Sequence, residues 1–116
     1  MGIIKALLGM KDIDVKGNMK VDTLMKKFEE SFGTKIRVYK TLNTGRGSRL
    51  ADPKATLASI GDKSRKVEGM TIKKSKTVGD IEEEFKEKVG IGIQIMTPDG
   101  KDFAPNDMKL KDVSKL

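Results

Sequence analysis

The sequence predicts an α+β protein in which two copies of one strand–helix–strand–turn unit pack as a single body, with a mixed or antiparallel sheet. Three observations lead to this prediction. The chain has 116 residues, which suffices for one compact domain or two very small ones. Residues 57 positions apart match along much of the chain. Inside each copy, apolar residues recur first at helical and then at strand spacing.

The internal repeat divides the chain. At an offset of 57 the identical pairs are Lys16 and Lys73, Val21 and Val78, Phe28 and Phe85, Glu30 and Glu87, and Gly33 and Gly90. The offset then falls to 53, with Leu50 matching Phe103, Ala51 matching Ala104, Leu57 matching Leu110, and Ile60 matching Val113. Because most matches are apolar, we assign them to the core. We therefore expect an N-terminal element over 1–14, a first unit over 15–60, a linker over 61–69 and a second unit over 70–116.

The N-terminal element carries a short apolar patch from Ile3 to Leu8. This patch is far shorter than the roughly 20 apolar residues that span a bilayer, and no cleavage site of a secretory signal follows it. We expect it to be the first element that faces the core. With no cysteine in the chain, the sequence favours a cytoplasmic protein without a membrane partner.

In the first unit, an apolar stripe predicts a helix over 21–32 that Gly33 ends. The alternation over 35–40 predicts a strand that turns Ile36 and Val38 inward, with Arg37 and Tyr39 on the opposite face. Further on, Asp52 is a typical N-cap residue and Pro53 a typical first residue of a helix. Gly61 is typical of a residue that ends a helix. They predict a short helix that carries Leu57 and Ile60.

The second unit follows the same course. A strand around 70–72 precedes Thr77, which with Asp80 predicts a capped helix start. The helix stripe contains Val78, Ile81, Phe85 and Val89, and Gly90 ends it. Alternating isoleucines over 91–95 predict the next strand, and Pro98–Gly100 predicts a turn.

The order of elements over Thr71–Val113 resembles part of the β-grasp, or ubiquitin-like, fold. The resemblance lies in the Thr77-Val78 helix start, the short strand after Gly90 and the Leu110-Lys111-Asp112-Val113 segment. The chain also resembles short bacterial and phage proteins that carry such doublets. Neither copy contains the full first hairpin of that fold, and the chain ends in Ser114-Lys115-Leu116 without a di-glycine. Conjugation is therefore not implied.

Positive charge is concentrated in the first unit. The chain carries a net charge of +7. Residues 1–66 hold eleven lysines and four arginines against seven acids, whereas residues 67–116 hold nine lysines against ten acids. All four arginines lie within 35–66. Arginine pairs with carboxylates and phosphates through two parallel hydrogen bonds, so this stretch favours an anionic partner.

The same stretch contains an insertion. Between the second strand and the next element the first unit has nine residues, Thr41–Arg49, where the second has five, Pro98–Asp102. The extra residues fall in Asn43–Arg49, a Gly-rich segment with two arginines. We predict a partner-binding surface that consists of Lys35, Arg37, Tyr39, Lys40, Arg46 and Arg49. The alternative is a solvated surface loop whose charges only keep the protein soluble.

The composition argues against catalysis. The chain has no Cys and no His, so it lacks the thiolate and imidazole groups of triads and of ordinary zinc sites. The run Glu82-Glu83-Glu84 lies on a predicted helix, where successive side chains point about 100° apart and cannot converge on one site. We interpret this run as a solvated helix face. No catalytic residue, metal or cofactor is predicted.

The sequence thus predicts a non-catalytic binding module whose basic first unit engages an acidic protein surface. The alternative is an accessory nucleic-acid-binding protein that contacts phosphates through the arginine-rich loop. Against it, no helix-turn-helix or aromatic RNA-recognition pattern is present, and Tyr39 is the sole aromatic near the loop. A third alternative is a homo-oligomer formed through exposed strand edges.

Overall fold

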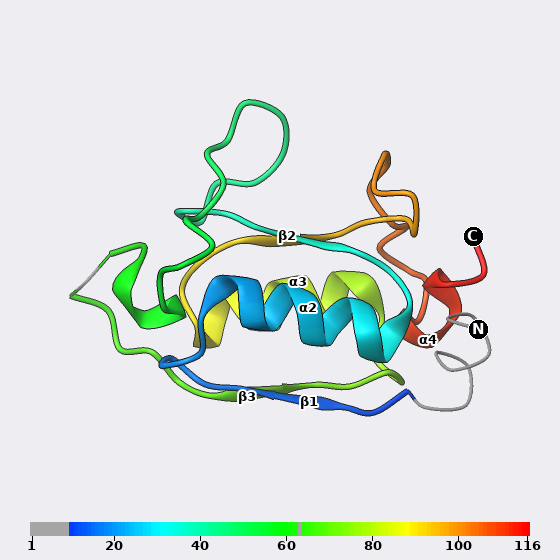
Figure 1. Cartoon of the computed structure of the whole chain (residues 1–116), viewed down its shortest axis with the longest axis horizontal. Coiled ribbons are helices and arrows are strands. Elements are labelled where there is room, and N and C mark those ends of the chain that lie inside the picture. Colours follow the sequence, from blue (N-terminus) through cyan, green and yellow to red (C-terminus); the bar gives the residue numbers. More distant parts are fainter. Residues whose placement is uncertain (1–9, 63) are drawn as a thin grey trace.

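Two helices form a layer between two narrow β-ribbons in the computed structural model (Figure 1). The structure describes residues 10–62 and 64–116. Its elements in chain order are β1 (Ile13–Val15), α2 (Val21–Phe32), β2 (Ile36–Val38), the 3-10 turn η1 (Leu57–Ser59), β3 (Met70–Ile72), α3 (Val78–Lys88), β4 (Ile93–Ile95) and α4 (Leu110–Val113). The predicted α+β class with two strand–helix–strand units is confirmed. The apolar patch over 3–8 lies outside the described residues.

The two units pair with each other strand by strand. β1 is antiparallel to β3 and β2 is antiparallel to β4, so the sheet consists of two separate two-stranded ribbons. The central pairs of these ribbons are Asp14 with Thr71 and Arg37 with Gln94. Both pairs join residues that are 57 positions apart in the sequence, so a pseudo-twofold axis runs through the middle of both ribbons. Each ribbon thus takes one strand from each unit.

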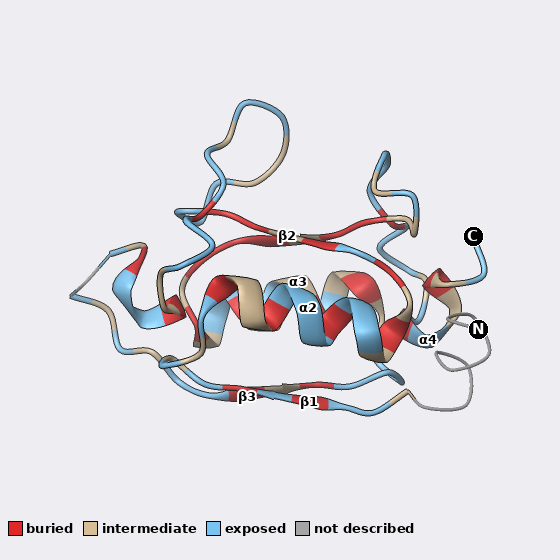
Figure 2. Ribbon diagram, viewed as in Figure 1, coloured by how far each residue is buried: buried red, intermediate tan, exposed pale blue. Residues whose placement is uncertain are grey.

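The core fills the space between the ribbons and the helices. Phe28, Phe32 and Phe85 are fully buried on the inward stripes of α2 and α3, as the periodicity predicts. The rings of Phe28 and Phe32 meet edge to face with their centroids 5.0 Å apart. Figure 2 shows buried positions on the helix surfaces that face the ribbons and on the strands. Inward strand residues alternate with outward ones in all four strands.

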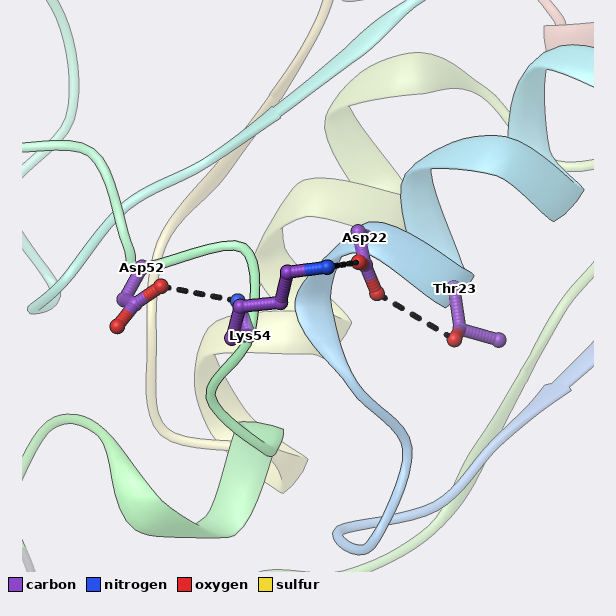
Figure 3. Close-up of polar contacts among 4 residues, drawn as sticks. All are labelled: Asp22, Thr23, Asp52 and Lys54. Atoms are coloured by element: carbon purple, nitrogen blue, oxygen red, sulfur yellow. Dashed lines mark hydrogen bonds and ion pairs between the residues drawn. The ribbon is translucent and has the colours of Figure 1, made fainter.

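The segment before η1 holds the start of α2. Lys20 offers no side-chain cap, and the first N–H groups of α2, on Val21 and Asp22, instead donate to carbonyl oxygens of the 53–55 segment at 2.9 and 3.0 Å. Figure 3 shows Lys54 between two acids, with its N–H bonded to Asp52 Oδ1 at 2.9 Å and its Nζ 3.7 Å from Asp22 Oδ2. The predicted start of the short helix at Asp52 and Pro53 is therefore wrong, and only the 3-10 turn Leu57–Ser59, with buried Leu57, forms within the predicted range. Asp52 and Pro53 form a turn, in which Asp52 O accepts the N–H of Ala55 at 3.1 Å while Pro53 O accepts from α2.

Helix α3 follows its prediction more closely. Thr77 Oγ1 accepts a hydrogen bond from the N–H of Asp80 at 3.2 Å, which confirms the predicted N-cap. The N–H of Val78 donates to Met108 O at 2.9 Å, and this bond is the repeat equivalent of the one from Val21 to Ala55. Gly33 and Gly90 follow α2 and α3 with φ angles of 69° and 82°, a left-handed conformation that favours glycine at helix ends.

Candidate functional site

The insertion forms a hairpin at one end of the β2–β4 ribbon. We call Lys40–Arg49 the basic loop and its repeat equivalent Thr97–Asp102 the second loop. Each is closed by one backbone hydrogen bond of 2.9 Å, from Lys40 N–H to Arg49 O and from Thr97 N–H to Asp102 O. The two bonds occupy equivalent positions, so the four extra residues of the first unit all lie inside the basic loop. Both loops extend away from the helices on the same side of the ribbon (Figure 1).

The base of the basic loop is held by β4 and the turn before it. The N–H of Gly92 donates to Thr41 O at 2.8 Å, and Gln94 Nε2 donates to Thr44 Oγ1 at 3.1 Å. A Cβ on Gly92 would collide with Thr44 Cγ2, so glycine is what lets the loop approach this closely. The tip is different, because Gly45 and Gly47 have no neighbour that an added Cβ would touch. The loop thus has a fixed base and an open tip.

Five of the six predicted binding residues are accessible. Lys35, Lys40, Arg46 and Arg49 are exposed, and Arg37 is half-buried at the centre of the ribbon. They do not form one cluster: Lys35 lies at the far end of β2, where a Cβ on Gly100 of the second loop would come within 3.1 Å of its Cδ. Within residues 10–62 and 64–116, none of the five pairs with an acid. They form a line of cations from one loop to the other.

Tyr39 corrects the prediction. Strand alternation places it outward beside Arg37, yet its side chain is only 1% exposed. It directly precedes the basic loop, and its N–H donates to Gly92 O at 2.9 Å. Its hydroxyl is buried and has no hydrogen-bond partner within the described part of the chain. Tyr39 therefore offers no surface to a partner.

Arg65 lies within the arginine-rich stretch but plays a structural part. Its guanidinium donates to three backbone carbonyls: Val89 O at 2.7 Å, Asp62 O at 2.7 Å and Leu57 O at 3.0 Å. These bonds join η1, the predicted linker and the C-terminal end of α3, where a cation is favoured. The side chain passes over Gly90, where a Cβ would collide with it. Of the four arginines, Arg37, Arg46 and Arg49 therefore remain accessible on β2 and the basic loop.

Exposed apolar side chains are the part of the surface that the sequence did not reveal. Leu42 is 53% exposed, Leu50 59% and Phe103 44%. Leu50 and Phe103 are repeat equivalents that we assigned to the core, and this assignment is wrong for both. They lie opposite Tyr39 and Met96 in single bridge pairs at the outer edges of β2 and β4. Leu42 and Leu50 thus place apolar surface in and directly after the basic loop.

The second loop, unlike the basic loop, carries exposed acids. Asp99 Oδ1 accepts hydrogen bonds from Thr97 Oγ1 at 2.6 Å and from Lys101 N–H at 3.0 Å. These bonds, with Thr97 the largest cause, hold the pKa of Asp99 below its ordinary value. With Asp102 also exposed, the second loop carries two acids where the basic loop carries three cations. The pseudo-twofold symmetry of the backbone is thus broken in charge.

Glu82 also departs from its predicted place on a solvated helix face. Its Oε2 accepts the N–H of buried Ile95 at 2.8 Å. Burial raises the pKa of Glu82, while this bond and nearby Lys86 act in the opposite direction. Its repeat equivalent is Met25, which cannot accept such a bond. Glu82 is therefore a structural acid that satisfies a strand N–H.

In the part of the chain that the structure describes, no three acidic side chains gather into a set that could hold a metal ion. No helix among these residues is long and apolar enough to cross a bilayer. Comparisons with models of known families, with curated proteins and with solved structures found no match.

Proposed function

We propose that this protein is a non-catalytic binding module whose basic loop and β2 surface engage an acidic surface of a protein partner. The observation that carries the proposal is the basic loop itself. It holds Lys40, Arg46 and Arg49 exposed, without a bound acid in the described structure, on a base that β4 keeps in place. A fixed base lowers the entropy that binding must overcome, and the open tip leaves both arginines free to form paired hydrogen bonds with carboxylates.

Two features favour a protein over a nucleic acid on this surface. Exposed Leu42 and Leu50 beside the cations suit an interface with an apolar centre and a charged rim. A uniform polyanion laid along β2 would also meet Asp99 and Asp102 of the second loop, whereas an acidic patch on a protein would contact the basic loop alone. Burial of Tyr39 removes the aromatic ring that could stack on a base.

The remaining parts of the proposal follow from sequence. The absence of Cys and His supports a role without catalysis. We place the module in the cytoplasm and regard each unit as β-grasp-like in the order of its elements, which suits protein contacts through a sheet surface. Self-association through strand edges is less favoured, because each strand is three residues long and charged residues flank the edges.

Affinity capture with matched variants tests the proposal. Arg46→Glu with Arg49→Glu reverses the charge of the loop, Leu50→Ser removes apolar contact, and Lys101→Glu in the second loop is the control. Because reversing two rim charges adds repulsion as well as removing attraction, we expect binding to weaken by about tenfold or more.

We expect the native chain and the Lys101→Glu control to retain an acidic protein that the double arginine variant and the Leu50→Ser variant both lose. Equal capture by all four proteins would contradict the proposal. If nuclease treatment abolishes the capture, the result would instead support the nucleic-acid alternative. Concentration-dependent assembly of the chain alone, unaffected by the loop variants, would favour the self-association alternative.

A further inference from the structure

The opposite side of the molecule has a second basic surface, which lies on both sides of the pseudo-twofold axis and shares one equivalent pair of lysines, Lys16 and Lys73. Two shallow pockets, of about 440 and 430 Å³, flank the β1–β3 ribbon at equivalent places in the two units. One lies between β1 and α2, and the other between β3 and α3. Lysines line both pockets: Lys16, Lys20 and Lys27 in the first, and Lys73, Lys76 and Lys88 in the second. Lys16 and Lys73 are identical residues at repeat-equivalent positions.

The acids in these pockets are already engaged. Asp14, the one acid of the first pocket, accepts a hydrogen bond from Thr71 Oγ1 at 2.8 Å across the ribbon. Glu84, the one acid of the second, pairs with Lys88 at 3.0 Å. The other five lysines are exposed and make no ion pair with any residue that the structure describes. With three lysines and one acid in its lining, each pocket carries an excess of positive charge.

The lining chemistry indicates the class of ligand. Lysine ammonium groups are compact point charges that bind phosphate without the planar geometry that arginine uses to read a base edge. No aromatic side chain lines either pocket, so neither offers a platform for the stacked bases of a single strand. These features suit contact with phosphates independent of sequence.

The symmetry indicates the form of that ligand. The pseudo-twofold axis passes between Asp14 and Thr71, so it relates the places of the two pockets and the Lys16 and Lys73 side chains in them. A double helix has twofold axes of its own and presents two phosphate backbones related by them. We propose that the β1–β3 side of the protein binds the backbone of a double-stranded nucleic acid, with one lysine pocket on each strand. This surface is separate from the basic loop, where acids on the second loop disfavour a polyanion.

Fluorescence anisotropy with labelled 20-base-pair DNA and RNA duplexes, and with a single strand of the same length, tests the inference at 50 and 200 mM salt. Lys16→Gln and Lys73→Gln change exposed, equivalent side chains, singly and together. Because each phosphate contact contributes about 0.9 to the slope of log K against log salt, we expect each single variant to lower the slope by about 0.9 and the double variant by about 1.8. Arg46→Gln with Arg49→Gln in the basic loop should leave duplex binding unchanged.

Four outcomes would overturn the inference. The first is no duplex binding at 50 mM salt, and the second is tighter binding of the single strand than of the duplex. The third is loss of duplex binding in the basic-loop variant but not in the lysine variants. The fourth is that polyglutamate of matched charge competes as well as the duplex itself. The third would move nucleic-acid binding to the basic loop, and so would also contradict the proposed function. The first and second leave the proposed function untouched, so the two failures can be told apart.

Discussion

The hydrogen bond between Glu82 and the N–H of Ile95 should contribute measurably to stability. Ile95 is fully buried, and its carbonyl accepts from Ala104 N–H at 2.9 Å. The neighbouring Met96 N–H donates across the ribbon to Lys35 O, so the N–H of Ile95 points away from β2. The Glu82 carboxylate accepts the hydrogen bond of this N–H. Replacing Glu82 with Ala would leave a buried donor unpaired, which costs about 1–3 kcal/mol.

A second variant separates the hydrogen bond from the charge. Glu82→Gln keeps a side-chain oxygen that can accept the bond but removes the cost of a partly buried charge. We therefore expect its free energy of unfolding at pH 7 to lie within about 0.5 kcal/mol of the native value, because the bond is retained. Burial raises the folded-state pKa of Glu82, so the folded state holds this proton more tightly than the unfolded state does.

The sign of the pH effect follows. The contribution of Glu82 to stability is greatest below its ordinary pKa and declines as pH rises through the raised folded-state value. The free energy of unfolding of Glu82→Gln, relative to that of the native protein, should therefore be higher at pH 7 than near pH 3.5. Urea unfolding of both variants at these two pH values measures this. A Glu82→Ala protein as stable as the native one would refute the assigned role of the bond.

Three further changes have definite expected results. Arg65→Lys keeps the charge but loses the fork that spans three carbonyls, and should lower the free energy of unfolding by about 2–3 kcal/mol in urea titrations; no loss would mean that these bonds are not maintained in solution. Tyr39→Phe removes a buried hydroxyl without a partner in the described structure, so stability should stay level or rise by up to about 1 kcal/mol, and a clear fall would show that the hydroxyl is satisfied. Thr97→Val removes the largest cause of the lowered pKa of Asp99, so NMR titration should find that pKa nearer its ordinary value, whereas an unchanged pKa would rule out this cause.

Much of the fold could be predicted because repetition and periodicity are local signals. Gly33, Gly90 and Thr77 mark helix ends through their own backbone and side-chain chemistry, and the structure confirms all three. The matching of residues 57 apart predicted two units. The repeat could not show that each strand pairs with the equivalent strand of the other unit. Alternation indicates which face of a strand is buried but not which strand lies beside it.

The site was harder to predict because it depends on contacts between distant segments. Alternation placed Tyr39 outward, yet its side chain is buried at the end of β2 where the basic loop begins. Arg65 looked like part of a basic patch, and only the approach of α3 and η1 turns it into a structural residue. Leu50 and Phe103 matched as apolar repeats, yet they lie at ribbon edges with nothing to cover them.

The loop insertion can be tested most directly by exchange between the two units. Residues 41–48 of the basic loop would be replaced with Pro-Asp-Gly-Lys, the sequence of 98–101, between positions whose closing hydrogen bonds are equivalent. Because the ribbon and core are unchanged, we expect the grafted protein to fold, as far-ultraviolet circular dichroism would show. Its binding to the acidic protein that we propose as partner, measured against the native chain, should be lost. A folded graft that binds the partner with native affinity would contradict the assignment of the basic loop as the binding site.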